Sequence, residues 1–276
     1  MRFFDLPERL ARHAWRVPLL GRALAADYAR WFDAKRPSNR FRGVYASFAE
    51  AEAAIPRDQR TGYDHDAMQG MYRHRMDKPC ESDYPVLFWL REALGEQRGA
   101  ADHVFDFGGH VGVSWYGWRE ALRFAPTLRW TVCDVPAIAR EGEALARERG
   151  VQDRLRFTSD ATDGADATVL LVAGSLQYVD FGIPELLAKM GARPRWILVN
   201  KQPLHDGDTF VTVQSTGRAF HPYRIDDRAR FVAGIVALGY RVVDDWTNRE
   251  VSCRIPFVRG HDVEMYSGYC FVRDEG

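Results

Sequence analysis

Residues 104–112, Val-Phe-Asp-Phe-Gly-Gly-His-Val-Gly, decide how this chain folds. The first half of the stretch is a short apolar run that ends at Asp106, and glycines follow at positions 108, 109 and 112. An apolar run of this length is typical of a buried parallel strand. The glycines let the backbone turn into a helix while it stays close to a ligand. The stretch therefore predicts a strand–turn–helix unit that binds a nucleotide-like molecule.

A second acid follows the next apolar run. Residues 129–133 contain Trp-Thr-Val-Cys, and Asp134 comes directly after them. A carboxylate at the end of the second strand can accept hydrogen bonds from both hydroxyls of a ribose. The two acids and the glycines together predict a cofactor with a nucleoside moiety.

Apolar runs and helical patterns alternate through the rest of the chain after residue 103. The expected strands are 103–107, 129–133, 155–158, 168–173, 196–199, 240–246 and 265–272, and the expected helices are 112–124, 136–149, 183–190 and 227–238. No helix fits between the last two strands, which are therefore expected to be antiparallel neighbours. The pattern predicts an α/β fold with a seven-stranded, doubly wound sheet whose last strand is antiparallel.

The first hundred residues differ from this pattern. They show helical patterns separated by turn signals and no convincing strand; the expected helices are 6–34, 47–54, 64–75 and 84–97. Ser47 and Glu50 have the spacing of a capping box at the start of the second of these helices. We expect two domains, a helical N-terminal cap or lid over residues 1–100 and a cofactor-binding domain over 101–276. Residues 200–224 are expected to form a long polar loop.

The composition restricts the class of protein. Hydrophobic residues make up 46% of the 276, and 38 basic side chains balance 38 acidic ones. No basic stripe favours nucleic acid, no charged tail favours a membrane surface, and no apolar run reaches the ~20 residues of a membrane span. The N-terminus lacks a signal-peptide core, and the four cysteines are scattered, so a cytoplasmic protein with reduced thiols is expected. The aromatic N-terminal helices suit a homodimer contact.

The spacing of the turn distinguishes between cofactors. A dinucleotide site has the pattern G-x-G-x-x-G, whereas this chain has G-G-x-x-G after an acid. Asp106 is expected close to the position of a pyrophosphate, where a like charge is unfavourable. S-adenosylmethionine carries a sulfonium and an ammonium group and no phosphate, so it suits this turn better. We expect this cofactor, with S-adenosylhomocysteine as its product.

These motifs resemble those of class I S-adenosylmethionine-dependent methyltransferases. Residues 106–112 match the first motif of that family, and Cys-Asp-Val-Pro at 133–136 resembles the second. More narrowly, segments 43–51, 62–64, 106–109, 176–178 and 212–214 are similar to an uncharacterised methyltransferase family found near polysaccharide and secondary-metabolite genes. The resemblance implies a Rossmann-like domain that transfers a methyl group to a small molecule or sugar, to oxygen in preference to nitrogen.

The chain departs from the family pattern in two places. His110 replaces the middle glycine of the first motif. If this position is left-handed, histidine is one of the residues that tolerate it; the alternative is that its side chain points into the site. Plant-type O-methyltransferases place a catalytic histidine after the fourth strand, where this chain has Ser-Leu-Gln-Tyr at 175–178. That base therefore cannot be transferred to this chain.

Candidate site residues follow from the expected strand ends. Asp134 is expected to bind the ribose, Asp160 or its neighbouring amide the adenine amino group, and Gly174 to keep the end of the fourth strand open. The full cofactor-binding set is Asp106, Gly108, Gly109, His110, Gly112, Asp134, Val135, Asp160, Ala161, Gly174 and Ser175. The candidates for the acceptor's base are His205, His221 and Tyr223. No metal site is expected, because His65, Asp66 and His74 lack compact ligand spacing.

Two other functions fit the same residues. One is an NAD(P)-linked oxidoreductase, and the other is a methyltransferase fold that has lost catalysis and serves as a binding protein. The intact acids at 106 and 134 and the glycines at 108 and 112 oppose the second of these, while His110 favours it.

Overall fold

A seven-stranded sheet forms the centre of the protein. The computed structural model describes residues 18–35, 38–56, 76–95 and 102–274. The strand order is β10-β11-β6-β5-β2-β3-β4, and β11 runs antiparallel to both of its neighbours. The strands are β2 (His103–Phe107), β3 (Arg129–Cys133), β4 (Leu155–Thr158), β5 (Val169–Ala173), β6 (Trp196–Gln202), β10 (Tyr240–Asn248) and β11 (Tyr266–Arg273). The predicted α/β sheet with an antiparallel last strand is confirmed.

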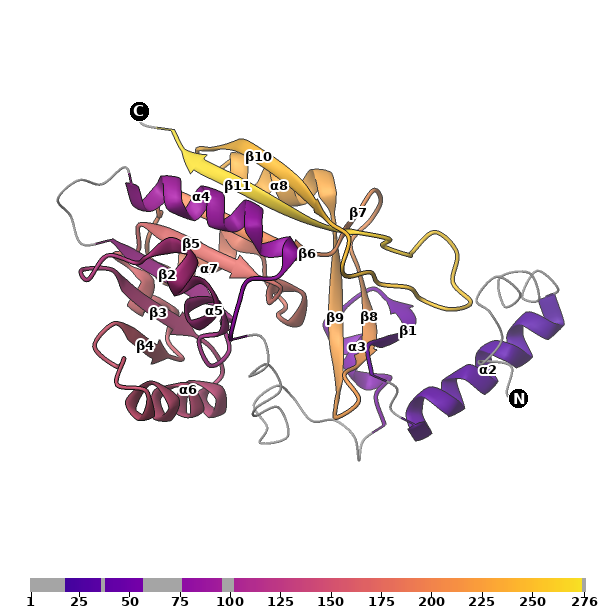
Figure 1. Ribbon diagram of the computed structural model, residues 1–276. Helices are drawn as coiled ribbons and strands as arrows, with labels where there is room; N and C mark the ends of the chain where they lie inside the picture. Colours follow the sequence, from indigo (N-terminus) through magenta and orange to yellow (C-terminus); the bar gives the residue numbers. More distant parts are fainter. Residues whose placement is uncertain (1–17, 36–37, 57–75, 96–101, 275–276) are drawn as a thin grey trace.

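Helices cover both faces of this sheet, as Figure 1 shows. The helices α4 (Tyr84–Gly95), α5 (Val113–Leu122) and α6 (Pro136–Glu148) share one apolar cluster with one face, and α7 (Ile183–Met190) and α8 (Arg228–Val236) share another cluster with the other face. Successive strand residues alternate between the two clusters, for example Val104 and Phe105. Burial on both faces explains why the central strands are continuous apolar runs.

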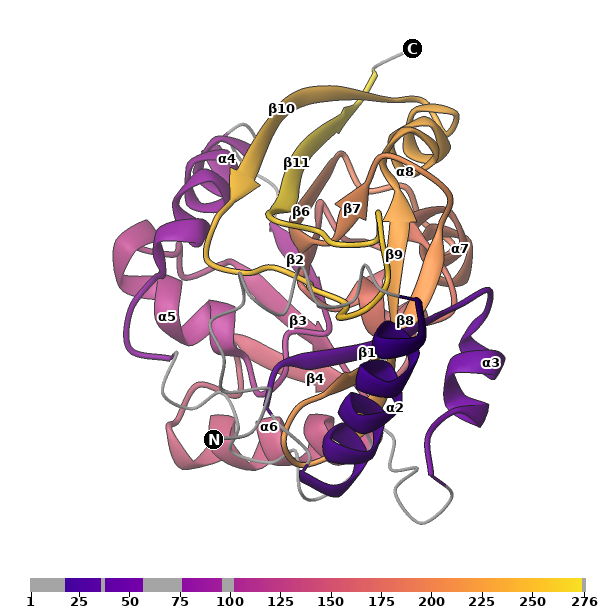
Figure 2. The same cartoon turned by 90° about the vertical axis from the view of Figure 1, so that its right-hand side faces the viewer.

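A second sheet of four strands lies at one end of the molecule. Its order is β1-β8-β9-β7, with β1 (Arg40–Tyr45), β7 (Leu204–His205), β8 (Phe210–Ser215) and β9 (Phe220–Asp227). The helices α2 (Pro18–Lys35) and α3 (Phe48–Ala53) pack on it through a cluster that includes Phe32 and Phe220, whose ring centroids are 5.1 Å apart. Figure 2 looks onto α2 and this small sheet, with the large sheet behind them.

The small sheet corrects two expectations. Residues 200–224 are not a polar loop, because they contain the end of β6, β7, β8 and part of β9. The first hundred residues do contain a strand, since β1 pairs with β8 from Arg40 opposite Ser215 to Tyr45 opposite Val211. The sequence of β1 has no apolar run, so this segment forms a strand only because it pairs with β8, which is distant in the sequence. The division of the chain near residue 100 stays a prediction.

The helical predictions hold where the structure describes the chain. The helix expected at 47–54 is α3, and the Ser47 side chain accepts a hydrogen bond from the Glu50 amide at 3.2 Å. The Glu50 carboxylate reaches back to the amide of Ala46 at 3.0 Å, one residue before the cap. The helix expected at 64–75, with His65, Asp66 and His74, lies outside the described residues.

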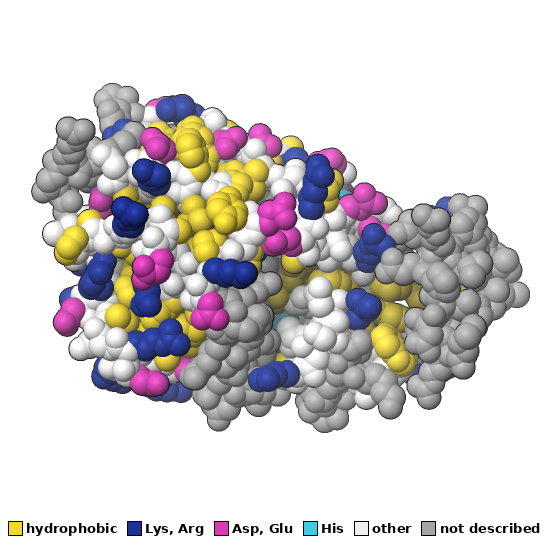
Figure 3. Space-filling view, in the orientation of Figure 1, with side chains coloured by type: hydrophobic (Ala, Val, Ile, Leu, Met, Phe, Trp, Pro, Cys, Tyr) yellow, Lys and Arg dark blue, Asp and Glu magenta, His cyan; other side chains and the backbone are white. Residues whose placement is uncertain are grey.

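One face of the described part of the molecule carries charged side chains of both signs. Lysine and arginine side chains alternate with aspartate and glutamate over the face drawn in Figure 3. In the described ranges, no helix combines the length and the apolar character needed to cross a membrane.

The contact between α6 and β4 gives a test of the core. A Cβ atom added at Gly142 would collide with the ring of Phe157, whereas nothing lies within 4 Å of one added at Gly95, the last residue of α4. We predict that Gly142→Ala lowers the free energy of unfolding by about 1–3 kcal/mol, because the overpacked ring must move. The matched change Gly95→Ala should leave stability unchanged or raise it by up to ~1 kcal/mol. Urea denaturation of both variants measures the difference; equal effects would contradict the close packing of Phe157 against α6.

Candidate functional site

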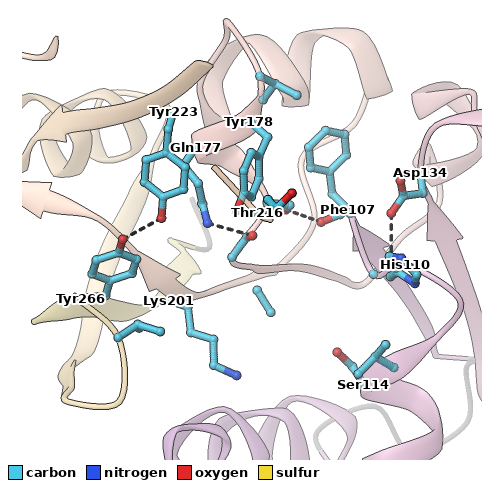
Figure 4. A pocket seen from close by; sticks show the side chains of 18 of the residues that line it. Phe107, His110, Ser114, Asp134, Gln177, Tyr178, Lys201, Thr216, Tyr223 and Tyr266 are labelled. Carbon is cyan, nitrogen blue, oxygen red and sulfur yellow. Dashed lines mark hydrogen bonds between the residues drawn. The ribbon is translucent and has the colours of Figure 1, made fainter. Parts of the chain in front are cut away.

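A cavity of about 790 Å³ opens between the two sheets. One wall is made by the carboxyl ends of β2, β3, β5 and β6, and residues of the small sheet and of the segment before β11 line the opposite wall. Its volume lies within the range of ligand sites, ~300–1,000 Å³. Figure 4 shows the side chains converging on this space, with Tyr223 and Tyr266 on one side and His110 and Asp134 on the other. The position agrees with the rule that ligands bind beyond the carboxyl ends of parallel strands.

The turn after β2 is packed so closely at Gly108 and Gly109 that a side chain is excluded at both positions. Gly108 has a φ of +74°, and an added Cβ would collide with the Ser175 side chain. A Cβ at Gly109 would collide with the Asp106 carboxylate. Ser175 in turn donates a hydrogen bond from its hydroxyl to the Phe107 carbonyl at 2.6 Å. These contacts hold the ends of β2 and β5 together and leave the backbone of the turn facing the cavity.

His110 occupies the middle position of the turn with a φ of +53°. This position is thus left-handed, as in the first of the two alternatives. Its amide donates to one carboxylate oxygen of Asp134 at 2.9 Å, and the Val135 amide donates to the other oxygen at 2.8 Å. Asp134 therefore ties the turn after β2 to the end of β3, and it lines the cavity as well.

Asp106 lies beneath the turn and does not line the cavity. The side chain is fully buried and accepts a hydrogen bond from the Trp130 indole at 3.2 Å. Burial raises the pKa of Asp106 to about 7, against the opposing effect of the Trp130 hydrogen bond, and the charge of Asp134 raises it further. The expected repulsion of a pyrophosphate by Asp106 is therefore weaker than the sequence suggests. Asp106 supports the turn from below.

Most of the predicted cofactor-binding residues come together in the cavity wall. Those that line it are Gly108, Gly109, His110, Asp134, Val135, Gly174 and Ser175. Besides Asp106, three predicted residues do not line it. Gly112 caps the start of α5, Ala161 packs against the apolar cluster beneath β5, and Asp160 is exposed and accepts a hydrogen bond from the Thr162 amide at 2.9 Å. Ser159, one residue earlier, lines the cavity in the place expected for Asp160.

The three predicted bases lie in different surroundings, and only Tyr223 lines the cavity. The Tyr223 and Tyr266 hydroxyls are 2.7 Å apart, and burial raises the pKa of Tyr223 well above its ordinary value. His221 is buried in β9, and burial lowers its pKa to about 4. His205 donates from its ring to the Asp208 carbonyl at 2.9 Å. Burial thus opposes ionisation of the Tyr223 hydroxyl, and His205 and His221 lie outside the cavity wall.

The wall opposite the glycine turn consists of hydroxyl and amide groups, of which sequence analysis selected only Tyr223 as a site residue. The Tyr178 hydroxyl donates to the Gln214 side chain at 2.8 Å, and the Gln214 amide donates to the Asn39 side chain at 3.2 Å. All three residues line the cavity beside Tyr223 and Tyr266. We name Asn39, Tyr178, Gln214, Tyr223 and Tyr266 the hydroxyl–amide wall. Finding it from sequence requires the pairing of β1 with β8.

An ion pair closes the remaining side of the cavity. The Lys201 ammonium lies 2.8 Å from a carboxylate oxygen of Asp83, and both side chains are largely buried. Lys201 stands near the end of β6, and Asp83 ends the short helix η5 (Glu81–Asp83) before α4. The site thus has one half at the glycine turn, a polar aromatic half at the hydroxyl–amide wall and an ion pair in addition.

Solved structures similar to this chain include several methyltransferases. The 1,6-didemethyltoxoflavin-N1-methyltransferase of Burkholderia thailandensis, with bound S-adenosylhomocysteine, is 17% identical over 77% of this chain and 84% of its own, with a TM-score of 0.48. The magnesium protoporphyrin IX methyltransferase of Synechocystis PCC 6803 is 13% identical over 77% and 97%, with a TM-score of 0.47. The mitomycin 7-O-methyltransferase MmcR is 18% identical with a TM-score of 0.40; the match covers 67% of this chain and about half, 52%, of that one.

No family model matches the sequence, and no curated protein matches it.

The buried carboxyl of Asp106 makes stability depend on pH. The folded state binds the proton more tightly than the unfolded chain, whose carboxyl titrates near the ordinary pKa of 3.8. This contribution to stability is complete below pH 3.8 and is lost as the pH rises to about 7. We predict that Asp106→Asn, which cannot ionise, gains stability relative to the wild type across this window, by roughly 1.4 kcal/mol for each unit of pKa difference. Urea denaturation at pH 4 and pH 8 measures it; a difference between the two proteins that does not change with pH would refute the assignment.

Proposed function

We propose that this protein is an S-adenosylmethionine-dependent methyltransferase that acts on a small molecule. The observation that carries the proposal is the juxtaposition of two unlike halves in one cavity. The glycine turn and Asp134 form one half, and the hydroxyl–amide wall forms the other. A group-transfer enzyme needs such an arrangement, because donor and acceptor must bind side by side.

The first half suits a nucleoside. Gly108 and Gly109 bring bare backbone to the cavity, and Asp134 stands at the end of the neighbouring strand. A carboxylate accepts up to about four hydrogen bonds, so one group can support the turn and also receive a ribose diol. The cavity-lining position of Ser159 at the end of β4 suits the adenine. The assignment of Asp160 to the adenine stays a prediction.

The second half suits a polar acceptor that contains a ring. Tyr178, Tyr223 and Tyr266 offer aromatic surface together with hydroxyl groups, and Gln214 and Asn39 offer amides. Aromatic faces bind rings, and amides with hydroxyls fix their orientation. Both oxygen and nitrogen acceptors fit such a wall, so the preference for oxygen stays a prediction. So does a homodimer contact through the N-terminal helices.

Bound S-adenosylmethionine would supply a methyl group on a sulfonium. The protein would hold the cofactor and the acceptor in the positions that methyl transfer requires. Methyl transfer is an in-line displacement, so its rate depends on the alignment of acceptor, methyl carbon and sulfur. The turn after β2 is held rigidly by Asp106, Asp134 and Ser175, which suits it to fix the donor. Two residues of the hydroxyl–amide wall, Gln214 and Tyr223, belong to the small sheet. The candidates for a base remain Tyr223, His221 and His205.

Isothermal titration with S-adenosylmethionine, S-adenosylhomocysteine and NADH tests the proposal. We predict that both sulfur ligands bind and that NADH does not. Asp134→Ala should lower the affinity for S-adenosylmethionine and S-adenosylhomocysteine about 10- to 100-fold, as expected for loss of hydrogen bonds to a charged group. Asp153→Ala, which removes an exposed acid in the turn before β4, is the matched control and should bind as the wild type does.

The alternatives give different results in the same titration. Binding of NADH without the sulfur ligands would replace the proposal with an oxidoreductase. Binding of none of the three would favour a binding protein that has lost catalysis. Unchanged affinity in Asp134→Ala would overturn the role of that residue even if the cofactor binds.

A further inference from the structure

The strand β6 contains an irregularity beside the cavity. Val199 pairs with Tyr269 and Gln202 pairs with Ser267, so two residues of β6, Asn200 and Lys201, lie opposite Gly268 alone. Lys201 has a φ of +54°, a left-handed conformation that costs a residue with a side chain roughly 1–2 kcal/mol. Bulges of this kind redirect a side chain and occur beside functional sites.

The bulge sends two consecutive side chains toward the same segment. Successive side chains of a regular strand point to opposite faces. Here the Asn200 amide donates to the Ser82 carbonyl at 2.9 Å, and the Lys201 ammonium donates to the next residue, Asp83, at 2.8 Å. The surrounding packing holds this geometry, because the Trp246 indole donates to Asn200 at 3.0 Å and its ring fills the space above Gly268.

Asp83 is held as firmly as Lys201. One of its carboxylate oxygens accepts from the Cys80 amide at 3.0 Å and from the Trp118 indole at 3.2 Å, while the other accepts from Lys201. Trp118 belongs to α5, the helix that follows the glycine turn. The position of the ammonium is therefore linked to the turn that we assign to the cofactor.

Lys201 is the one lysine or arginine among the described residues that line the cavity. Its Cβ lies beside the end of β5, at 3.4 Å from a Cβ built on Gly174. Figure 4 shows the side chain extending into the space between Tyr266 and Ser114. An ammonium has three N–H donors, and Asp83 receives one of them.

We propose that Lys201 binds the carboxylate of the cofactor's amino-acid moiety and that Asp83 positions it. The inference rests on the proposed function and adds to it the residue that recognises the far end of the cofactor. Along the edge of the sheet the order is β4, β3, β2, β5, β6. With the ribose at Asp134, after β3, and the adenine at Ser159, after β4, the amino-acid end would extend in the opposite direction, toward β2, β5 and β6.

The distances and charges agree with this assignment. Neighbouring strands are ~4.8 Å apart, so the end of β6 lies about 14 Å from the end of β3, and the long lysine side chain covers part of that span. The amino-acid end carries an ammonium beside its carboxylate. The Lys201–Asp83 ion pair is complementary to such a zwitterion, because its ammonium can face the carboxylate and its carboxylate the ammonium. A lysine alone would be complementary only to the carboxylate.

The test removes the carboxylate from the ligand and the ammonium from the protein. The ligands are S-adenosylhomocysteine and S-adenosyl-3-thiopropylamine, which lacks only the carboxylate, and the method is isothermal titration. We expect the wild type to bind the decarboxylated ligand about 10- to 100-fold more weakly. The Lys201→Met variant should bind the two ligands with the same affinity, within about two-fold. The Lys201→Arg variant should restore much of the wild-type difference in affinity between them.

The controls separate this inference from the proposed function. Lys189→Met removes an exposed lysine outside the cavity wall and should keep the wild-type difference. Equal binding of the two ligands by the wild type, or the same difference in Lys201→Met, would overturn the inference while the proposed function stands. Failure of the wild type to bind either ligand would overturn the proposed function. Since the ligand comparison in the wild type needs no substitution, the inference stays testable even if Lys201→Met does not fold; Lys201→Gln then provides the second neutral variant.

Discussion

The site depends on close contact between backbone and neighbouring side chains at the turn after β2. Ser175 occupies the space that a side chain at Gly108 would need, and Asp106 occupies the space beside Gly109. Asp134 then fastens the turn through the amide of His110. The ends of β2, β3 and β5 are joined in this way into one rigid edge. The left-handed His110 contributes to this edge through its amide, which donates to Asp134.

The large sheet could be predicted from the sequence because its strands are buried on both faces. Continuous apolar runs, such as 169–173, can belong only to the interior, and the acids and glycines that end them mark the carboxyl edge. The same signal led to eleven predicted cofactor-binding residues, of which seven line the cavity. It could not show that Asp106 lies beneath the turn, since the position of a carboxyl relative to a turn is decided by three-dimensional packing.

The small sheet and the hydroxyl–amide wall apart from Tyr223 could not be predicted by this reasoning. The strand β8 is fully buried, yet it contains Thr212, Gln214 and Ser215, so it lacks an apolar run. Pro222 stands within β9, where it removes a donor from the ladder and opposes the assignment of a strand. Local rules fail most often where side chains serve a site. The bulge at Asn200 and Lys201 could not be predicted either, because no local sequence pattern indicates a left-handed lysine.

The pairing of β1 with β8 has a consequence for how the protein is made. Arg40 lies opposite Ser215, so this contact closes a loop that includes most of the large sheet. Long loops are costly to close and slow to form unless the intervening chain is already compact. During synthesis β1 leaves the ribosome long before β8, and the large sheet is expected to assemble around β2 first. The cavity is therefore completed late, and a nascent chain bearing the finished glycine turn would still lack a place for the acceptor.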